Sequence, residues 1–344
     1  MSATEPVPPA SPPLFVAVNS SCNLTCWYCT KLGENRSAGR HVSSQRLAQI
    51  FEVAYERGVR TFRFTGGEPT LRLDIGEILL AAQALGDDVR IAMTTNGVRL
   101  DRVVDVIEHL REPRLFISVD GIDKTLPRGG RGKSEFLIEK WLTPKLEKAI
   151  DSVRPFAALR LNYVLTRSSE PQLPALIDYA SSRGFDVKIF ELLLRDFYYA
   201  GHRPRVDVFE EQYLSVRQLL PSLRRSYGTS RPFGGTGGRG IPMFAFDAGS
   251  SQIVYFDSAV GSHYGDVCHA CPHFPCQEGL YALVLDANGM LHPAGCVNKK
   301  LHVPLAVAGR AAIEEAFDRL QGTIDASTLQ PAVPEALLSA SSGA

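Results

Sequence analysis

Short apolar runs alternate with longer amphipathic segments from Leu14 to about Leu194, and this alternation constrains the fold more than any other feature. Short apolar runs indicate strands, whereas apolar residues that recur every three to four positions indicate helices. The expected strands are residues 14–19, 61–65, 90–94, 115–119, 159–165 and 187–192. The expected helices are residues 43–57, 73–85, 100–110, 134–150 and 171–182, with Pro144 as a break point in the fourth. Six strand-then-helix units predict an α/β fold with a parallel sheet and outer helices, as an open or partial barrel.

Polar and glycine-rich residues follow the expected strands. The first strand leads into Cys22-Asn-Leu-Thr-Cys26-Trp-Tyr-Cys29, the second into Gly66-Gly67-Glu68-Pro69, the third into Thr95-Asn96-Gly97 and the fourth into Asp120-Gly121. Asn162 lies in the fifth strand and Glu191 near the end of the sixth. Because function in such folds sits at the carboxyl ends of the strands, we expect these residues to meet at one edge of the sheet.

The first cysteine group, Cys22, Cys26 and Cys29, has C-x3-C-x2-C spacing. Fe–S clusters are usually held by four Cys thiolates, so three close cysteines leave one iron of a cubane cluster open to another ligand. The alternatives are a zinc loop that lacks its fourth ligand and three unrelated buried cysteines. Gly66 and Gly67 could bring bare backbone close to a ligand, or they could form an ordinary tight turn.

The second cysteine group has the spacing C-x2-C-x4-C-x19-C, formed by Cys268, Cys271, Cys276 and Cys296. Four thiolates suit a closed site, and spacing alone slightly favours a structural zinc over an Fe–S cluster. An odd total of seven cysteines argues against a disulfide framework and for metal binding or catalysis. His269, His273 and His292 lie nearby and are expected to be surface or hydrogen-bonded histidines.

Composition excludes several partners. Lys and Arg number 37, as do Asp and Glu, so no overall field favours nucleic acid or an anionic membrane. No apolar run reaches the roughly 18 residues needed to span a bilayer. Residues 1–13 are rich in proline and lack the features of a signal peptide, so we expect a disordered lead-in and a cytoplasmic protein.

The motifs that follow the strands resemble those of the radical S-adenosylmethionine (SAM) superfamily. Within it, the chain is similar to the branch that contains the GTP 3′,8-cyclase of molybdenum cofactor biosynthesis. The likeness covers roughly residues 14–194. Besides the three-cysteine loop it rests on Arg63-Phe-Thr-Gly-Gly-Glu-Pro69, Thr94-Thr-Asn-Gly97, Ser118-Val-Asp120, Asn162-Tyr-Val-Leu165 and Phe190-Glu-Leu-Leu193, in this order.

The resemblance implies a partial (β/α)6 TIM-like barrel whose 4Fe–4S cluster, held by the first three cysteines, chelates SAM. One electron, from a donor such as flavodoxin or ferredoxin, then cleaves SAM to methionine and a 5′-deoxyadenosyl radical. By position, Tyr28 and the backbone of Leu193 would touch the adenine, Gly66 and Gly67 the methionyl amine, and Ser118 the carboxylate or ribose. The same motifs supply the further cofactor-binding candidates Glu68, Pro69, Thr94, Asn96 and Asn162.

In the context of this resemblance, the second cysteine group favours an auxiliary 4Fe–4S cluster, with zinc as the alternative. The cyclase has three cysteines in this region and the present chain has four, so Cys276 is a candidate for a spare ligand or a hydrogen donor.

Departures from the cyclase point to a different substrate. Phe15 stands where the cyclase has an arginine, its C-terminal Arg-Leu-Arg run and double glycine are absent, and His273-Phe-Pro lies near the place of that run. We therefore do not expect GTP cyclisation. Arg63 and Arg160 remain, either as holders of a substrate carboxylate or phosphate or in structural ion pairs.

The function expected is radical chemistry on a small polar metabolite, a sugar, nucleoside or glycosyl acid, in natural-product biosynthesis, by decarboxylation or rearrangement. Arg63, Arg160, Glu191 and Cys276 are the candidate substrate contacts or hydrogen donors. One alternative is modification of a ribosomal peptide, which the few residues before the first strand disfavour. An alternative of another class is a non-enzymatic zinc or Fe–S scaffold.

The expected organisation has five parts. They are the lead-in 1–13, the radical SAM barrel 14–200, a connecting segment 201–262, an auxiliary cluster domain with a final helix 263–325, and a flexible tail 326–344. Within the last three parts we expect a helix at 209–220, a glycine-rich mobile loop at 228–240, strands at 253–256 and 280–285, and a helix at 306–320. A turn at 286–289 is expected to join the strand 280–285 to 290–292 as a hairpin.

Overall fold

The computed structural model describes most of the chain and places twelve strands in one sheet, to which the site elements belong. The described residues are 11–29, 41–125, 138–192, 206–234, 239–257, 260–271, 274, 276, 279–296 and 298–330, with side chains from 209 onward in the segment that begins at 206. The strand order is β13-β12-β11-β1-β2-β3-β4-β5-β6-β9-β8-β7.

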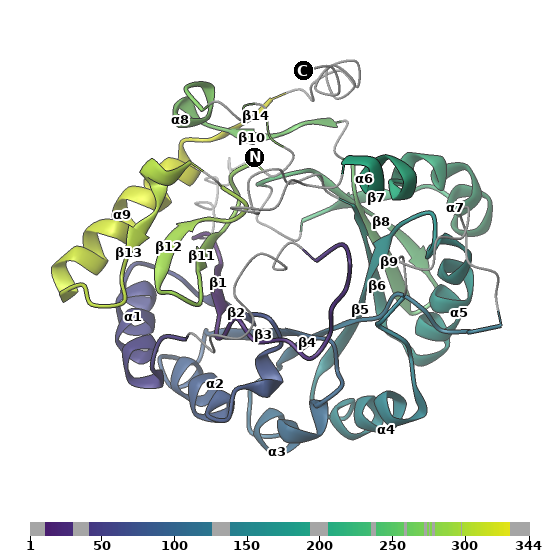
Figure 1. Cartoon of the computed structure of the whole chain (residues 1–344), viewed down its shortest axis with the longest axis horizontal. Helices are drawn as coiled ribbons and strands as arrows, with labels where there is room; N and C mark the ends of the chain where they lie inside the picture. Colours follow the sequence, from purple (N-terminus) through teal and green to yellow (C-terminus); the bar gives the residue numbers. More distant parts are fainter. Residues whose placement is uncertain are drawn as a thin grey trace, which may run out of the picture.

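The six expected strands form the centre of this sheet and run parallel in chain order, as predicted. They are β1 (Leu14–Ala17), β2 (Thr61–Thr65), β3 (Arg90–Thr95), β4 (Arg114–Ser118), β5 (Ala158–Leu165) and β6 (Asp186–Glu191). Figure 1 shows the sheet curved into a partial barrel with the helices outside it. The predicted partial TIM-like barrel is therefore confirmed.

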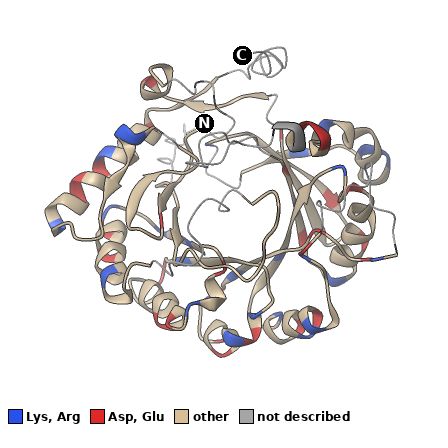
Figure 2. Cartoon of the chain, in the orientation of Figure 1, with Lys and Arg blue, Asp and Glu red and all other residues tan. Residues whose placement is uncertain are grey.

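The helices outside the barrel follow the expected order with altered bounds. They are α1 (Ser44–Glu56), α2 (Ile75–Gln83), α3 (Val104–Ile107), α4 (Pro144–Val153) and α5 (Leu173–Arg183). Figure 2 shows acidic and basic residues mixed along these outer helices.

Two of these helices differ from the prediction. The segment 100–110 forms a 3-10 turn, Leu100–Arg102, followed by the short α3, because the chain breaks at Val103. Pro144 begins α4 and does not interrupt a longer helix, since a proline suits the first helical turn and the Thr143 side chain accepts a hydrogen bond from the Leu146 amide at 3.2 Å. Residues 138–143 are not helical, and 126–137 lie outside the described residues.

The two faces of the parallel strands have different chemistry, because successive side chains point to opposite faces. Phe62 and Phe64 of β2 are fully buried and pack against Phe51 of α1, with ring centroids 5.3 and 5.9 Å apart. Arg63 between them therefore faces the barrel interior. The same alternation places Phe116 and Ser118 of β4 on the interior face, together with Arg160, Asn162, Lys188 and Thr94.

The C-terminal half of the chain extends the sheet at both edges. β9 (Ser251–Phe256) lies parallel to β6 and is followed by the antiparallel β8 (Met243–Ala248) and β7 (Arg231–Phe233). At the opposite edge β11 (Leu283–Leu285) lies parallel to β1 and pairs with β12 (Met290–Pro293) in the expected hairpin. β13 (Val303–Pro304) completes that edge. The segment 201–262 thus contributes three strands to the barrel sheet.

Several C-terminal elements differ from their predicted bounds. The expected helix 209–220 consists of α6 (Val206–Gln212), a 3-10 turn (Val216–Gln218) and α7 (Leu220–Tyr227). The expected loop 228–240 contains β7, and its residues 235–238 lie outside the described part. The final helix α9 is Arg310–Asp325, because the chain turns at Gly309 before it.

Beyond α9, β14 (Thr328–Gln330) pairs antiparallel with β10 (Ser262–Tyr264). β14 lies inside the segment 326–344, which we expected to be a flexible tail. At the other end of the chain, the Pro13 carbonyl accepts a hydrogen bond from the Leu283 amide at 3.0 Å. Residues 1–10 and 331–344 lie outside the described part. No helix in the described ranges has the length and hydropathy needed to cross a membrane.

Candidate functional site

The three-cysteine loop leaves the sheet at the carboxyl end of β1. The Val18 amide still bonds to the Thr65 carbonyl of β2 at 2.9 Å, and the chain then turns away from the strands. Cys26 is 6% exposed, and Cys22 and Cys29 are partly buried. The Cys29 amide donates to the Cys26 carbonyl at 3.0 Å, which closes a turn between the last two cysteines. The loop therefore lies where the prediction puts the site.

The glycines after β2 allow this loop to approach closely. The Gly67 amide donates to the Asn19 carbonyl at 3.0 Å and the Glu68 amide to the Ser21 carbonyl at 2.7 Å. A Cβ on Gly67 would stand 2.1 Å from the Ser21 carbonyl oxygen, and one on Gly66 2.7 Å from that of Asn19. The Gly67 amide thus holds the chain before Cys22. The expected contact of these glycines with a ligand stays a prediction.

Glu68 joins the loops after β2 and β3. Its side chain is 1% exposed, and its Oε1 accepts hydrogen bonds from the Thr70 amide (3.1 Å), the Thr70 hydroxyl (2.6 Å) and the Thr95 hydroxyl (2.6 Å). Its Oε2 accepts from the Asn96 amide at 2.7 Å. Glu68 therefore holds the two loops together, and its Oε2, with one donor, can accept a second. The expected contact of Glu68 with the cofactor stays a prediction.

Asn96 connects these loops to the cysteine loop. Its Nδ2 donates to the Asn23 Oδ1 at 2.9 Å and lies 4.0 Å from the Cys22 Sγ. Its Oδ1 accepts from the Val98 amide at 3.0 Å. Pro69 is buried and begins the 3-10 turn Pro69–Leu71. The motif residues after β2 and β3 thus meet beside the first cysteine.

Asp120 and Lys140 lie beside the last two cysteines, and the sequence analysis did not name either as a site residue. The Tyr28 hydroxyl donates to Asp120 Oδ2, and the Val164 amide donates to Asp120 Oδ1 at 3.0 Å. The Lys140 Nζ lies 3.8 Å from Asp120 Oδ2 and 4.9 Å from the centre of the Tyr28 ring. Asp120 belongs to a recognised motif, whereas nothing in the sequence around Lys140 distinguishes it.

The segment that carries Lys140 also holds the cysteine loop directly. The Glu139 carboxylate accepts hydrogen bonds from the Thr25 amide, at 2.5 Å, and from the Thr25 hydroxyl. The Lys140 carbonyl accepts from the Asp120 amide at 2.8 Å. The loop is therefore held from two sides, by the loops after β2 and β3 and by residues 139–140.

Charged groups around the loop act on the pKa of its thiols in opposite directions. Burial lowers the pKa of Lys140, but Asp120 and the three cysteines outweigh burial and raise it above its ordinary value. Burial raises the pKa of Cys26 to about 12, and Lys140 acts in the opposite direction. Burial and Asp120 raise the pKa of Tyr28 well above its ordinary value, so its hydroxyl stays protonated and donates.

The donor set at the loop fits an Fe–S cluster. Three thiols on one short loop match the soft ligands that iron–sulfur clusters and zinc take, and metal binding deprotonates thiols whose pKa burial has raised. Beside the loop, the Asn19 Oδ1 and Ser20 Oγ are buried and have no hydrogen-bond partner among the described residues, so these polar atoms can accept or donate to a bound group. Within the described ranges, no three His, Cys, Asp or Glu side chains converge closely enough to ligate one ion.

The two candidate arginines lie in the barrel interior and are held by other predicted residues. The Arg63 Nε donates to the Thr94 hydroxyl at 3.0 Å, and the Arg160 Nε donates to the Asn162 Oδ1 at 3.3 Å. Thr94 and Asn162 thus position the arginines. Their expected contact with the cofactor stays a prediction. Ser118 pairs in register with Asn162 on the neighbouring strand.

The remaining candidates lie elsewhere. The Glu191 carboxylate accepts from the Ser215 hydroxyl (3.0 Å) and the Val216 amide (2.6 Å), so it caps the 3-10 turn at Val216–Gln218. Leu193 and His273 lie outside the described residues.

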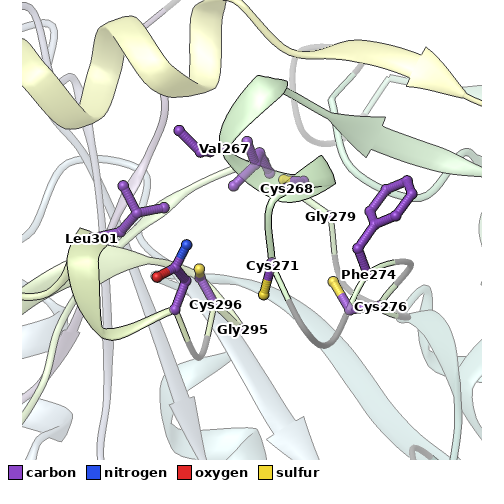
Figure 3. Close-up of a pocket in the computed structure, with 11 residues that line it drawn as sticks. Val267, Cys268, Cys271, Phe274, Cys276, Gly279, Gly295, Cys296 and Leu301 are labelled. Carbon is purple, nitrogen blue, oxygen red and sulfur yellow. The ribbon is translucent and has the colours of Figure 1, made fainter.

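The four C-terminal cysteines line one pocket, as Figure 3 shows. Cys268 comes from the short α8 (Asp266–His269), and Cys296 follows β12. The pocket has an empty volume of about 430 Å³, part of it open to solvent. Its other lining residues are mainly apolar and include Val267, Phe274, Leu280, Leu301. Four thiols around an apolar pocket fit a four-ligand cluster site, although within the described ranges no three of them lie close enough to ligate a single ion.

The surroundings of this pocket stabilise its loops. The Tyr264 hydroxyl donates to the Cys276 carbonyl. His302 contacts the Cys296 carbonyl through Nε2 at 3.0 Å and stacks on His292, with ring centroids 4.4 Å apart. Burial raises the pKa of Cys296 to about 11. No disulfide joins any of the seven cysteines, all of which lie in the described part.

Comparison with known proteins identifies a domain in the N-terminal half of the chain. Residues 16–153 match the radical SAM superfamily. The chain is 29% identical over 202 residues to a probable GTP 3′,8-cyclase of Methanococcus maripaludis, covering 57% of this chain and 64% of that protein. It is 28% identical over 236 residues to the GTP 3′,8-cyclase of Stenotrophomonas maltophilia, covering 67% and 70%. The chain thus spans somewhat less than two thirds of the Methanococcus relative.

A solved structure extends the likeness to nearly the whole fold. The structure of Streptococcus suis SuiB bound to S-adenosylmethionine matches with a TM-score of 0.55 and 16% identity, covering 92% of this chain and 68% of that one. At 16% identity the match is evidence for the fold alone. With the cysteine loop and its neighbouring motifs in place, residues 16–153 are a radical SAM domain, and the chain is similar to the GTP 3′,8-cyclases.

Proposed function

We propose that this protein reductively cleaves S-adenosylmethionine at a 4Fe–4S cluster held by Cys22, Cys26 and Cys29, and abstracts hydrogen from a small polar metabolite. The observation that carries the proposal is the attachment of the three-cysteine loop to the loops after β2 and β3, through Gly67, Glu68 and Asn96. The cluster with bound SAM supplies the radical chemistry, and an external donor such as flavodoxin or ferredoxin supplies the electron.

The residues of this chain orient the reacting groups and exclude water. The Tyr28 hydroxyl donates to Asp120, so the ring is the part of Tyr28 that can contact the adenine. Lys140, beside Tyr28 and Asp120, is a cation well placed for the SAM carboxylate. The buried Asn19 Oδ1 can accept a hydrogen bond from the methionyl amine, close to Gly66. Ser118 and the backbone of Leu193 remain the proposed contacts of the SAM carboxylate or ribose and of the adenine.

We propose a second 4Fe–4S cluster at Cys268, Cys271, Cys276 and Cys296, with zinc as the alternative and Cys276 as a candidate hydrogen donor. All four cysteines line one pocket, and this supports a four-ligand cluster site. In this scheme residues 14–200 perform SAM cleavage, and the pocket region within 263–325 helps to bind or process the substrate.

The substrate proposed is a sugar, nucleoside or glycosyl acid of natural-product biosynthesis, altered by decarboxylation or rearrangement. Phe15, which replaces an arginine of the cyclases, lies against Arg63 with its ring centre 4.9 Å from the guanidinium carbon. An aromatic wall in place of a cation removes one phosphate contact, and this supports a substrate other than GTP.

Anaerobic reconstitution tests the proposal. We expect about eight irons per chain, from two cubane clusters, and release of 5′-deoxyadenosine with dithionite and SAM. Cys26→Ala should abolish that release. Cys276→Ala, as the matched variant in the other cysteine group, should lower iron content while 5′-deoxyadenosine release persists. Two results would refute the proposed chemistry. One is a wild-type chain that binds zinc and shows no visible absorbance. The other is a Cys26→Ala variant that releases as much 5′-deoxyadenosine as the wild type.

A further inference from the structure

A largely buried ion pair follows the Gly-Gly-Glu-Pro motif. The Arg72 Nε donates to the Asp74 Oδ1 at 2.6 Å, and its Nη2 donates to the Asp74 Oδ2 at 2.9 Å. The Arg72 side chain is 3% exposed and that of Asp74 32%, whereas Leu73 between them is 91% exposed. The chain thus turns two charged side chains inward and an apolar one outward, the reverse of the usual order. The sequence analysis singled out neither charged residue.

Asp74 is the N-cap of α2 but does not cap it. An aspartate at this position usually accepts a hydrogen bond from a backbone amide of the first helical turn. The Asp74 side chain makes no such bond. Hydrogen bonding by Arg72 and by Ser44, the first residue of α1, instead lowers the pKa of Asp74, although burial opposes this. The carboxylate is therefore ionised and serves Arg72 rather than its own helix.

The remaining arm of Arg72 contacts the base of the cysteine loop. Its Nη1 donates to the carbonyl of Val18, the residue at which the chain leaves β1, at 2.6 Å. A buried guanidinium needs partners of this kind, because burying an unpaired charge is costly. The planar fork of an arginine holds a carboxylate and a carbonyl in fixed relative positions, which the single ammonium of a lysine does not. Arg72 therefore fixes the Val18 carbonyl relative to Asp74.

The two residues after Val18 carry buried polar atoms. The Asn19 Oδ1 and the Ser20 Oγ have no hydrogen-bond partner in the part of the chain that the structure describes. The rest of Asn19 is held by the loop after β2, since its Nδ2 donates to the Glu68 carbonyl at 3.0 Å and its own carbonyl accepts from the Gly67 amide. The Val18 carbonyl is thus the other point at which this short segment is held.

We propose that Arg72 is a positioning residue for SAM, which holds Val18 and thereby places the Asn19 Oδ1 to accept from the methionyl amine. This deepens the proposed function, on which it rests. A hydrogen bond from a charged amine is strong but weakens steeply when its geometry is poor, so a small shift of residues 18–20 lowers SAM affinity. The cysteines keep their own attachment to the loops after β2 and β3, so cluster assembly does not depend on Arg72.

SAM binding and SAM cleavage are measured side by side on the anaerobically reconstituted full chain. Equilibrium dialysis with labelled SAM gives the dissociation constant, and 5′-deoxyadenosine release with dithionite gives the half-saturating SAM concentration and the maximal rate. We expect Arg72→Met to raise both concentrations about tenfold or more. Iron content and the maximal rate should stay within about twofold of the wild type, because the lost interaction acts on binding. Arg72→Lys keeps the charge without the fork and should have an intermediate effect.

Arg60→Met is the matched control. Arg60 precedes β2, at the opposite end of that strand from the cysteine loop. Its guanidinium likewise bonds an aspartate, Asp88, at 2.5 Å and a backbone carbonyl, that of Tyr55, at 2.7 Å. Its replacement removes the same kinds of contact and should leave SAM affinity unchanged.

SAM affinity separates positioning from mere stabilisation. If Arg72→Met lowers the urea midpoint but binds SAM like the wild type, or if Arg60→Met loses as much affinity, the proposal is overturned. If Arg72→Met does not fold, Arg72→Lys decides by the same comparison. A wild type that binds SAM but releases no 5′-deoxyadenosine refutes the proposed function separately, and the dissociation constants still decide the role of Arg72. A wild type that does not bind SAM overturns both.

Discussion

Glu68→Gln is the substitution that most directly tests how the cysteine loop is held. The amide side chain keeps the shape of the carboxylate but replaces one oxygen with a nitrogen that donates. With its oxygen kept toward Thr70 and Thr95, its NH₂ group would face the Asn96 amide, so two donors would oppose each other at the 2.7 Å contact. The other three hydrogen bonds remain but lose the charge of the acceptor.

The magnitude follows from these contacts. A hydrogen bond to a charged group contributes about 1.5–3 kcal/mol, and a buried donor left without a partner costs about 1–3 kcal/mol. One bond is lost and three are weakened at a site that is 1% exposed, so we expect the free energy of unfolding to fall by about 2–4 kcal/mol.

Urea denaturation followed by circular dichroism measures this change, with Glu52→Gln as the control. Glu52 is exposed on α1, and its substitution should change the free energy of unfolding by less than about 0.5 kcal/mol. Because Glu68 fixes the loops beside Cys22, Glu68→Gln should also reduce iron content after reconstitution. If both variants unfold at the wild-type urea concentration and retain full iron, the four hydrogen bonds do not hold the loop and our reasoning fails.

Three further changes test other parts of the structure. Gly67→Ala should lower the urea midpoint sharply, because its Cβ would meet the Ser21 carbonyl, whereas Gly322→Ala, with no atom within 4 Å of its Cβ, should leave the midpoint unchanged or raise it. Tyr28→Phe should raise several-fold the SAM concentration needed for half-maximal 5′-deoxyadenosine release, since it removes the hydrogen bond to Asp120; an unchanged value would contradict the positioning of the ring by that bond. Lys188→Met should stabilise the protein. Between the lowered pKa of folded Lys188 and the ordinary value of 10.5, the unfolded wild-type chain binds a proton that the folded chain does not. The wild-type melting temperature should therefore rise with pH in this window, and a variant with the same slope would contradict the lowered pKa.

The parallel core of the fold was predictable because its strands are short apolar runs bounded by glycine and polar residues. The fully buried Phe62 and Phe64, on either side of Arg63, exemplify the pattern. The first and last residues of the helices were less predictable, because capping hydrogen bonds decide where a helix begins. Pro144 could either interrupt a helix or begin one. It begins α4, because the Thr143 side chain caps the helix at that point.

The candidate site was predictable where chemistry depends on residues close in the sequence. The cysteine spacing and the Gly-Gly-Glu-Pro motif are local, and the structure brings them together. Lys140 and Lys188 were not predictable, because their neighbours in space come from distant segments. Glu68 shows a further limit: the sequence indicates the motif to which Glu68 belongs, but not that its side chain accepts four hydrogen bonds from the loops after β2 and β3.

The pairing of β1 with β11 has a consequence for synthesis of the chain. β1 begins at Leu14, yet its outer edge is covered only when Leu283 joins it, and β6 waits for Ile253 in the same way. Until the ribosome has released those segments, the nearly complete parallel barrel carries two open strand edges, which are templates for pairing with other chains. A chain truncated before residue 283 should therefore aggregate even though the cysteine loop and all six parallel strands are present.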